Sequence, residues 1–207
     1  MLDKKDKNGI VIAFLGPDGA GKSSIIERLK VKVAGYSSVT YFHLKPTIIK
    51  YSTKKQIAIL DPHRLPNRTA WMSLLKLIYF IFVYRIGFLV NVNPKKSNNG
   101  LVIFDRYFYD VIIDPKRYRV GLPSKLVVLL AKLIPEPDIL FVIDAPTDLI
   151  QDRVSEVPAF ETERQRQAYL KLVDIYPFFK TIDASGSVDE SVSQVLTHME
   201  GVLSGAK

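Results

Sequence analysis

Short, almost continuous apolar runs alternate along the chain with longer segments in which apolar residues recur at helical spacing. The apolar runs predict core strands at 10–15, 39–43, 101–105, 138–143 and 178–182. The helical segments are 22–34, 69–92, 123–134, 147–157, 161–175 and 188–203. Strands that are apolar nearly throughout are typical of parallel sheets covered on both faces. The alternation therefore predicts an α/β protein with a doubly wound parallel sheet built from βαβ units.

A glycine-rich stretch separates the first predicted strand from the first predicted helix. Residues 16–23 read Gly-Pro-Asp-Gly-Ala-Gly-Lys-Ser, which fits the phosphate-binding pattern G-x-x-x-x-G-K-[ST]. In such a loop, backbone N–H groups and the positive end of the helix converge on phosphate oxygens. Lys22 is expected to reach the β- and γ-phosphates of a nucleotide, and the Ser23 hydroxyl to ligate Mg²⁺. The alternative is a chance glycine-rich turn, and the strand and helix on either side argue against it.

Length and composition narrow the classes of protein. The 207 residues suit one domain, since no repeat or linker divides them, and residues 1–8 are expected to be a frayed polar tail. The absence of cysteine excludes disulfides and Cys-ligated zinc, and it fits a cytoplasmic protein. The net charge of +8 favours anionic ligands such as nucleotides or sugar phosphates. The positive residues are scattered without an aromatic platform motif, so nucleic acid is not an expected partner.

Two segments depart from the regular alternation. Residues 44–68 contain three prolines and no clean period, and we interpret them as an acceptor-side lid or a disordered crossover. The segment 69–92 is very apolar, with Lys76 and Arg85 as its charges from residue 71 onward. Its uncharged interval, 77–84, is much shorter than the ~20 residues of a membrane span. We favour a helix that is buried in the core and in a dimer interface, with contact to a membrane surface as the alternative.

A second group of polar residues follows the third predicted strand. Residues 93–100 are expected to form a turn-rich loop, and the strand after it ends in Asp105-Arg106-Tyr107. An aspartate at the end of an apolar strand, downstream of a phosphate-binding loop, is typical of the second protein contact to Mg²⁺. The alternative is an aspartate that caps a turn.

Three of these motifs together resemble the thymidylate kinase family. They are the loop G-x-D-G-x-G-K-S at 16–23, the Asp-Arg-Tyr at 105–107 and the Ile-Asp-Ala-Ser at 182–185. The resemblance covers most of residues 9–200 and is weakest at 44–92. It implies a three-layer α/β/α P-loop NTPase fold with a five-stranded parallel sheet flanked by helices, ATP and Mg²⁺ as cofactors, and a homodimer through the helix 69–92.

The resemblance also implies roles for individual residues. Asp18 would approach the phosphoryl acceptor, and Arg106 would hold the acceptor or the moving phosphoryl group. Arg153, at the start of a lid-like segment 153–164, would approach the ATP phosphates, unless it is a solvated helix charge. Arg164 and Arg166 are further lid candidates. The residues expected to bind ATP are Gly16, Asp18, Gly19, Ala20, Gly21, Lys22, Ser23, Ser24, Ala184 and Ser185.

The chain departs from the family pattern on the acceptor side. Residues 44–47 read Leu-Lys-Pro-Thr where the family has Arg-Glu-Pro-Gly, and the family's Ser-x-x-Ala-Tyr-Gln is missing from 108–119. In its place, residues 116–119 read Lys-Arg-Tyr-Arg, which is either an exposed basic turn or a contact to an anionic acceptor. Other acceptor-side candidates, each with a structural alternative, are His43, Asp110 and Asp114.

These observations support two classes of function. The first is a Mg²⁺-dependent kinase that transfers the γ-phosphoryl group of ATP to a small anionic acceptor, either a nucleoside monophosphate or a diverged acceptor such as a sugar phosphate. The second is a P-loop nucleotide switch or NTP hydrolase that regulates a partner. Against the second, the chain has no Asn-Lys-x-Asp motif, and Asp144 is followed by Ala145-Pro146 rather than by a switch glycine.

Overall fold

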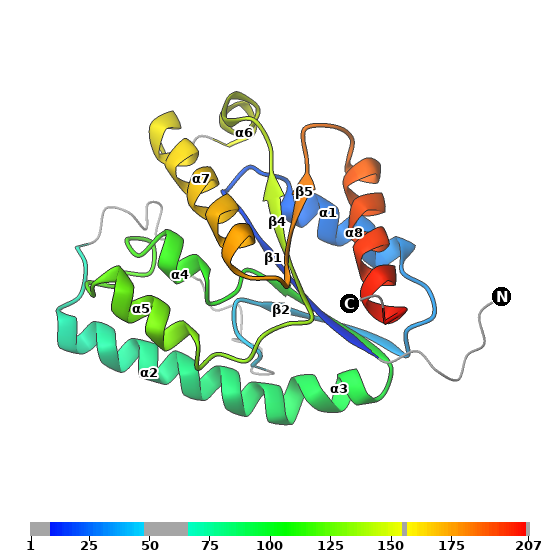
Figure 1. Ribbon diagram of the computed structural model, residues 1–207, viewed down its shortest axis with the longest axis horizontal. Helices are drawn as coiled ribbons and strands as arrows, with labels where there is room; N and C mark the ends of the chain where they lie inside the picture. Colours follow the sequence, from blue (N-terminus) through cyan, green and yellow to red (C-terminus); the bar gives the residue numbers. More distant parts are fainter. Residues whose placement is uncertain (1–8, 48–65, 155–156, 206–207) are drawn as a thin grey trace, which may run out of the picture.

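The computed structural model describes residues 9–47, 66–154 and 157–205, which fold around one parallel sheet (Figure 1). Its strands are β1 (Ile10–Leu15), β2 (Ser38–His43), β3 (Gly100–Asp105), β4 (Ile139–Asp144) and β5 (Phe179–Asp183). They pair in the order β2-β3-β1-β4-β5, and every pairing is parallel. The predicted five-stranded parallel sheet is confirmed, with strand bounds within a residue of the prediction.

Helices cover both faces of the sheet (Figure 1). One apolar core lies between the sheet and α1 (Lys22–Lys32), α6 (Thr147–Arg153) and α8 (Val188–Leu203). The other core lies between the sheet and α2 (Ala70–Gly87), α4 (Asp110–Ile113), α5 (Ser124–Ala131) and α7 (Ala159–Ile175). The three-layer α/β/α architecture expected from the sequence is therefore confirmed.

The central strand β1 decides where the polar loops meet. All six of its residues are buried, because it has β3 on one side, β4 on the other and helices on both faces. In the sheet register Phe14 lies beside Asp105, and Asp105 lies beside His43. The carboxyl ends of β1, β2 and β3 thus reach the same edge, which is where ligands bind in open α/β sheets.

The prediction of a turn-rich loop at 93–100 is wrong for its first half. The chain stays helical beyond α2, through a π-helical turn at Phe88–Val92 and then α3 (Asn93–Ser97). Pro94 stands in the first turn of α3, where a missing N–H is tolerated. The π-turn just before it, in which the Asn93 N–H bonds to the Phe88 carbonyl, widens the helix next to the proline ring.

Other boundaries differ less. The helix predicted at 147–157 ends at Arg153, and α7 begins two residues before the predicted 161. The short helix α4 was not predicted. Some of the predicted segments lie outside the described residues. They are the expected tail 1–8, the part 48–65 of the irregular segment, and residues 155–156 of the lid-like segment.

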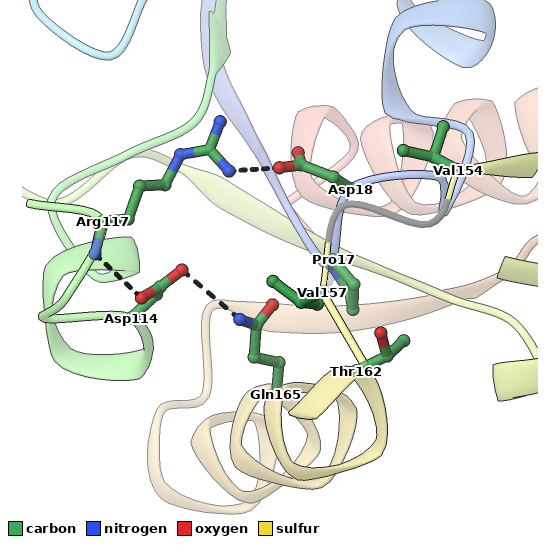
Figure 2. A pocket seen from close by; sticks show the side chains of 8 residues that line it. All are labelled: Pro17, Asp18, Asp114, Arg117, Val154, Val157, Thr162 and Gln165. Carbon is green, nitrogen blue, oxygen red and sulfur yellow. Dashed lines mark hydrogen bonds and ion pairs between the residues drawn. The ribbon is translucent and has the colours of Figure 1, made fainter. Parts of the chain in front are cut away.

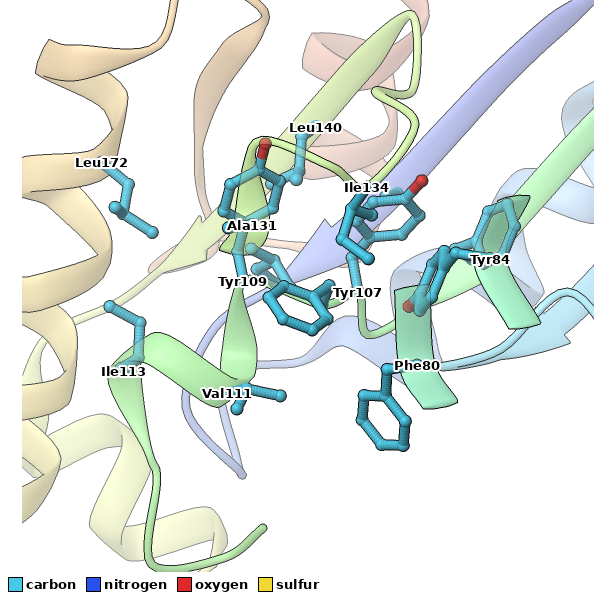
Figure 3. Packing of buried hydrophobic residues seen from close by; sticks show 14 of the residues in the cluster. Phe80, Tyr84, Tyr107, Tyr109, Val111, Ile113, Ala131, Ile134, Leu140 and Leu172 are labelled. Carbon is cyan, nitrogen blue, oxygen red and sulfur yellow. The ribbon is translucent and has the colours of Figure 1, made fainter. Parts of the chain in front are cut away.

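The helix α2 has two different faces. Its inner residues, including Phe80 and Tyr84, are buried against Tyr107 and other aromatic side chains that follow β3 (Figure 3). Its outer face is apolar but exposed: Trp71, Phe82 and Ile86 are 66%, 61% and 57% exposed. We call this surface the outer face of α2. It comprises Trp71, Leu75, Ile78, Tyr79, Phe82 and Ile86, together with Leu89 and Val90 of the π-helical turn that follows α2.

The helical stretch Ala70–Ser97 is long and apolar enough to cross a membrane by composition alone. Its most apolar window has a mean hydropathy of 1.8, and 33% of that window is buried inside the protein. The inner face of α2 packs on the sheet, as in a core helix, and its other face is exposed in the part of the chain that the structure describes.

Candidate active site

The phosphate-binding loop follows the central strand and leads into α1. Gly16 has a φ of 140°, and a Cβ atom there would lie 2.5 Å from the Ile143 carbonyl oxygen, so only glycine fits. Gly19 and Gly21 also have positive φ, and α1 begins directly at Lys22. The backbone therefore makes the tight turn that brings N–H groups and the helix N-terminus to one point.

Lys22 lies within this loop. Its side chain is buried, and the ammonium donates hydrogen bonds of 2.7 Å to the Gly16 and Pro17 carbonyls. Burial, together with repulsion from Arg106, lowers the pKa of Lys22 to about 8, although Asp18 acts in the opposite direction. The loop thus holds a buried ammonium that bonds to two neutral carbonyls and lies 3.9 Å from Asp18 Oδ1.

Asp105 stands at the end of β3, beside the loop. It is 9% exposed, and its Oδ2 atom accepts a 2.8 Å hydrogen bond from the Tyr41 hydroxyl and lies 3.7 Å from His43 Nδ1. Burial opposes ionisation, but the contacts to His43 and Tyr41 hold the pKa of Asp105 below its usual value. Asp105 is therefore a carboxylate, and both contacts use the same one of its oxygens.

Arg106 adopts a backbone conformation that is rare for a residue with a side chain. Its φ is 75°, and its N–H bonds to the Phe14 carbonyl at 3.0 Å. Such strain is common where a side chain must point in one particular direction. The guanidinium contacts Asp18 in the loop and lies 3.3 Å from Asp110 Oδ2.

Asp110 has a structural position behind Arg106. It is 1% exposed and accepts hydrogen bonds from the Tyr169 hydroxyl at 2.7 Å and the Tyr118 hydroxyl at 3.4 Å. Burial raises the pKa of Asp110, although Arg106 and Tyr169 act in the opposite direction. With its oxygens occupied by three donors, this carboxyl lies behind Arg106 and does not line the cleft.

Arg117 reaches the loop from the turn after α4 (Figure 2). Its guanidinium pairs with Asp18, and its backbone N–H bonds to Asp114 Oδ1 at 3.0 Å. Gln165 from α7 donates to the other oxygen of Asp114 at 3.3 Å, which fixes the turn. Burial opposes the ionisation of Asp18, but Arg106, Lys22 and Arg117 together hold its pKa well below the usual value.

The side chains around the loop line a cleft of about 480 Å³. The predicted residues that line it are Asp18, Gly19, Gly21, Lys22, Ser23, Ser24, His43, Asp105, Arg106, Arg117 and Arg153. A smaller cavity of about 180 Å³ adjoins it, with Ala20, Gly21, Ser24, Arg153 and Ala184 among its lining residues. Arg153 lines both, and its guanidinium lies 3.4 Å from the Ala184 carbonyl.

Several candidates lie elsewhere. Arg164 pairs with Glu161, and Arg166 pairs with Asp144 and Glu163, so neither lines the cleft. The basic segment 116–119 is not a uniformly exposed turn, because Tyr118 is buried. Ser185 is exposed, and its N–H bonds to the Asp183 side chain.

Sequence reasoning missed two tyrosines of this site. Tyr41 contacts Asp105 from the neighbouring strand, and Tyr169 contacts Asp110 from α7. In the sequence, Tyr169 lies in the predicted helix 161–175 and Tyr41 in the predicted strand 39–43, and neither belongs to a motif. Both contacts depend on strand order and helix packing, which leave no local signal.

The two residues predicted to ligate Mg²⁺ both line the cleft and have the oxygen atoms that this ion prefers. They are the exposed hydroxyl of Ser23 and the carboxylate of Asp105. Among the described residues, no cluster of three or more histidine or acidic side chains could hold a metal ion by itself.

A phosphate-binding loop after the central strand, together with a carboxylate and an arginine at the end of the neighbouring strand β3, is typical of P-loop enzymes that act on nucleotide phosphates. The family model described as thymidylate kinase matches residues 14–195. The chain therefore belongs to the thymidylate kinase family, a family of ATP-dependent nucleoside monophosphate kinases.

Individual relatives agree with this assignment. The chain is 24% identical over 214 aligned positions to a thymidylate kinase of Lactobacillus acidophilus, covering 93% of this chain and 94% of the relative. It is 30% identical over 120 positions to a probable thymidylate kinase of Thermococcus kodakarensis, where the match spans only 54% of this chain and 58% of the relative.

Solved structures show the same fold. A thymidylate kinase from Candida albicans matches with a TM-score of 0.62 at 17% identity, covering 93% of this chain and 92% of that one. A thymidylate kinase from Ehrlichia chaffeensis matches with a TM-score of 0.62 at 21% identity, covering 93% and 99%.

Proposed function

We propose that the protein is a Mg²⁺-dependent kinase that transfers the γ-phosphoryl group of ATP to a small anionic acceptor. The observation that carries the proposal is the convergence of Lys22, Asp105, Arg106 and Arg117 on one cleft of about 480 Å³. A cleft of this size suits a drug-sized ligand, and three of the four groups are cations that match phosphate.

The transfer is an in-line displacement. An acceptor oxygen bonds to the γ-phosphorus while the bond from that phosphorus to the β,γ-bridging oxygen breaks, and ADP leaves with the electron pair. Lys22 and the loop amides hold the donor phosphates. Arg106, fixed from behind by Asp110, faces the moving group. A phosphate acceptor needs no base, whereas an alcohol would need Asp105 or Asp18 to take its proton.

Ser23 and Asp105 would hold Mg²⁺, which supplies charge neutralisation on the phosphates. We assign the smaller cavity near Ala184 and Ser185 to the adenine of ATP, with Arg153 between this cavity and the cleft.

The acceptor would be a nucleoside monophosphate or a diverged molecule such as a sugar phosphate, with thymidylate a poor substrate. The support is the replacement of the family's acceptor segments at 44–47 and 108–119, where Arg117 now pairs with Asp18. A site built to hydrogen-bond one ligand rejects analogues that leave its polar groups unpaired, by up to ~10⁴–10⁵.

The test is ATP consumption against a panel of nucleoside monophosphates and sugar phosphates, with and without Mg²⁺. Turnover that requires an acceptor supports a kinase. Turnover that is the same without any acceptor contradicts it and favours the hydrolase or switch. A clear preference for thymidylate would contradict the proposal that thymidylate is a poor substrate, and would leave the kinase proposal unchanged.

We also propose a cytoplasmic homodimer. The support for the dimer is the outer face of α2, an exposed apolar stripe that a second copy of the chain would cover. Membrane-surface contact by this face is the competing proposal, and the mass of the protein in solution separates the two.

A further inference from the structure

A cavity outside the cleft lies where β2 ends against the first turns of α2. It has a volume of about 360 Å³, and its lining includes Lys45, Arg68, Lys76, Tyr79 and Phe80. Three of these residues are cationic and two are aromatic. None of them was assigned a role in the transfer of the phosphoryl group.

The two lysines of the cavity share one aromatic ring. The Lys45 ammonium lies 4.5 Å from the centroid of the Phe80 ring and 5.0 Å from that of Tyr79. The Lys76 ammonium lies 5.6 Å from the centroid of Phe80 and donates a hydrogen bond to the Tyr118 carbonyl. Both positive charges are thus held close together over the apolar floor of the cavity.

These charges have no counter-charge among the described residues. No ion pair joins a described carboxylate to Lys45, Arg68 or Lys76. Burial lowers the pKa of Lys76 to about 8, with further lowering by the charges of Arg68, Lys45 and Arg119. Cations held together against their mutual repulsion are typical of a site that binds an anion.

One short turn contacts both the cavity and the cleft. Arg117 sends its side chain to Asp18 in the cleft, while the carbonyl of the next residue, Tyr118, accepts from Lys76 in the cavity. Arg119 then bonds to the Pro66 carbonyl just before α2. The turn that carries Arg117 into the cleft is therefore also bonded to a lysine of the cationic cavity.

We propose that this cavity binds a second anionic group of the phosphoryl acceptor. The acceptor class is then a small molecule with an anionic group at each end, such as a bisphosphate or a phosphorylated carboxylic acid, with an apolar or flat body that contacts Phe80. This inference rests on the proposed kinase function. It also gives a physical reason for weak use of thymidylate, whose single phosphate would occupy the cleft and leave the cavity cations unpaired.

Matched pairs of probes test the proposal on the full chain saturated with ADP. The pairs are thymidine 5′-monophosphate with thymidine 3′,5′-bisphosphate, and ribose 5-phosphate with ribose 1,5-bisphosphate, with affinities measured by calorimetry. We expect at least one bisphosphate to bind about tenfold more tightly than its monophosphate, since it adds charge-assisted hydrogen bonds. Equal affinity within both pairs would overturn the proposal.

Variants of the cavity residues show whether the preference for a bisphosphate comes from this cavity. Lys76→Met should remove most of the preference for the bisphosphate, and Lys132→Met, which removes an exposed charge just after α5, should keep it. Arg68→Gln, at an exposed position, is the second variant if Lys76→Met does not fold. A preference that survives in both cavity variants would overturn the assignment to this cavity.

The same samples separate this inference from the kinase proposal. ATP turnover with the monophosphates and no bisphosphate preference would reject the cavity and keep the kinase. A bisphosphate preference that Lys76→Met removes, without ATP turnover on any acceptor, would reject the kinase and keep an anion-binding cavity.

Discussion

Arg117 and Asp18 are 99 positions apart in the sequence and form an ion pair at the mouth of the phosphate-binding loop. Asp18 also pairs with Arg106, so one carboxylate holds two guanidinium groups. An anionic acceptor offers these arginines a second negative partner in the same place. The pair therefore keeps both arginines ordered at the point where the phosphoryl group is expected to move.

Arg117→Met should lower kcat/KM for the acceptor by about 10²–10³, the usual effect of removing one group that stabilises transition-state charge. The effect on ADP affinity should be much smaller, because Arg117 faces Asp18 and not the loop amides. Lys116→Met is the matched control, since Lys116 is the exposed neighbour in the same turn. Equal losses in the two variants would show that only the net charge of the turn matters.

Asp105→Asn should impair Mg²⁺-dependent turnover more than nucleotide binding. The amide keeps the shape of the side chain and its contact with Tyr41, but it lacks the charge that a metal ligand supplies. The measurement is turnover across a Mg²⁺ titration, with ADP affinity measured in parallel. An unchanged titration curve would exclude Asp105 as a Mg²⁺ ligand.

Lys22→Ala should fold normally and lose turnover by about 10²–10³. The ammonium bonds to two carbonyls of its own loop and lies 3.9 Å from Asp18 Oδ1, so its removal leaves the apolar core intact. Circular dichroism checks the fold, and coupled ADP release measures turnover. Turnover near that of the unchanged protein would contradict the role of Lys22 as the phosphate-binding lysine.

The kcat/KM for ATP should fall as the pH rises through about 8. This parameter reports ionisations of the free enzyme, and Lys22 attracts phosphate only while it is protonated, which is below its pKa. Lys76 has a similar pKa, so Lys76→Met is the control and should keep the same pH step. If the pH step disappears in Lys76→Met, the pH dependence comes from Lys76 and not from Lys22, and the prediction is wrong.

Phe82→Glu should convert the proposed dimer to a monomer. Phe82 is in the middle of the outer face of α2, and a buried charge without a partner is costly in an interface. Val31→Glu, at a 78% exposed position on α1, is the control and should leave the mass in solution unchanged. If the unchanged protein is already a monomer by analytical ultracentrifugation, the dimer proposal is wrong.

The sequence predicted the elements that depend on local pattern and missed those that depend on packing. The apolar runs located all five strands of the sheet within a residue, because a parallel strand covered on both faces must be apolar along its length. The same reasoning failed at 93–97, where Pro94 and the asparagines indicated a loop. The π-turn before α3 makes a helix compatible with that proline, and no pattern in the sequence indicated this π-turn.

The sequence by itself determined the phosphate-binding loop, the fold class and the pair Asp105-Arg106, since each depends on residues close together in the chain. Only the tertiary structure decided which other groups join them. Tyr41, Asp110 and Arg117 reach the site because β2 lies beside β3 and because the turn after α4 folds back to the loop. Strand order and helix packing are set by burial over the whole chain, so these contacts cannot be predicted from any one segment of it.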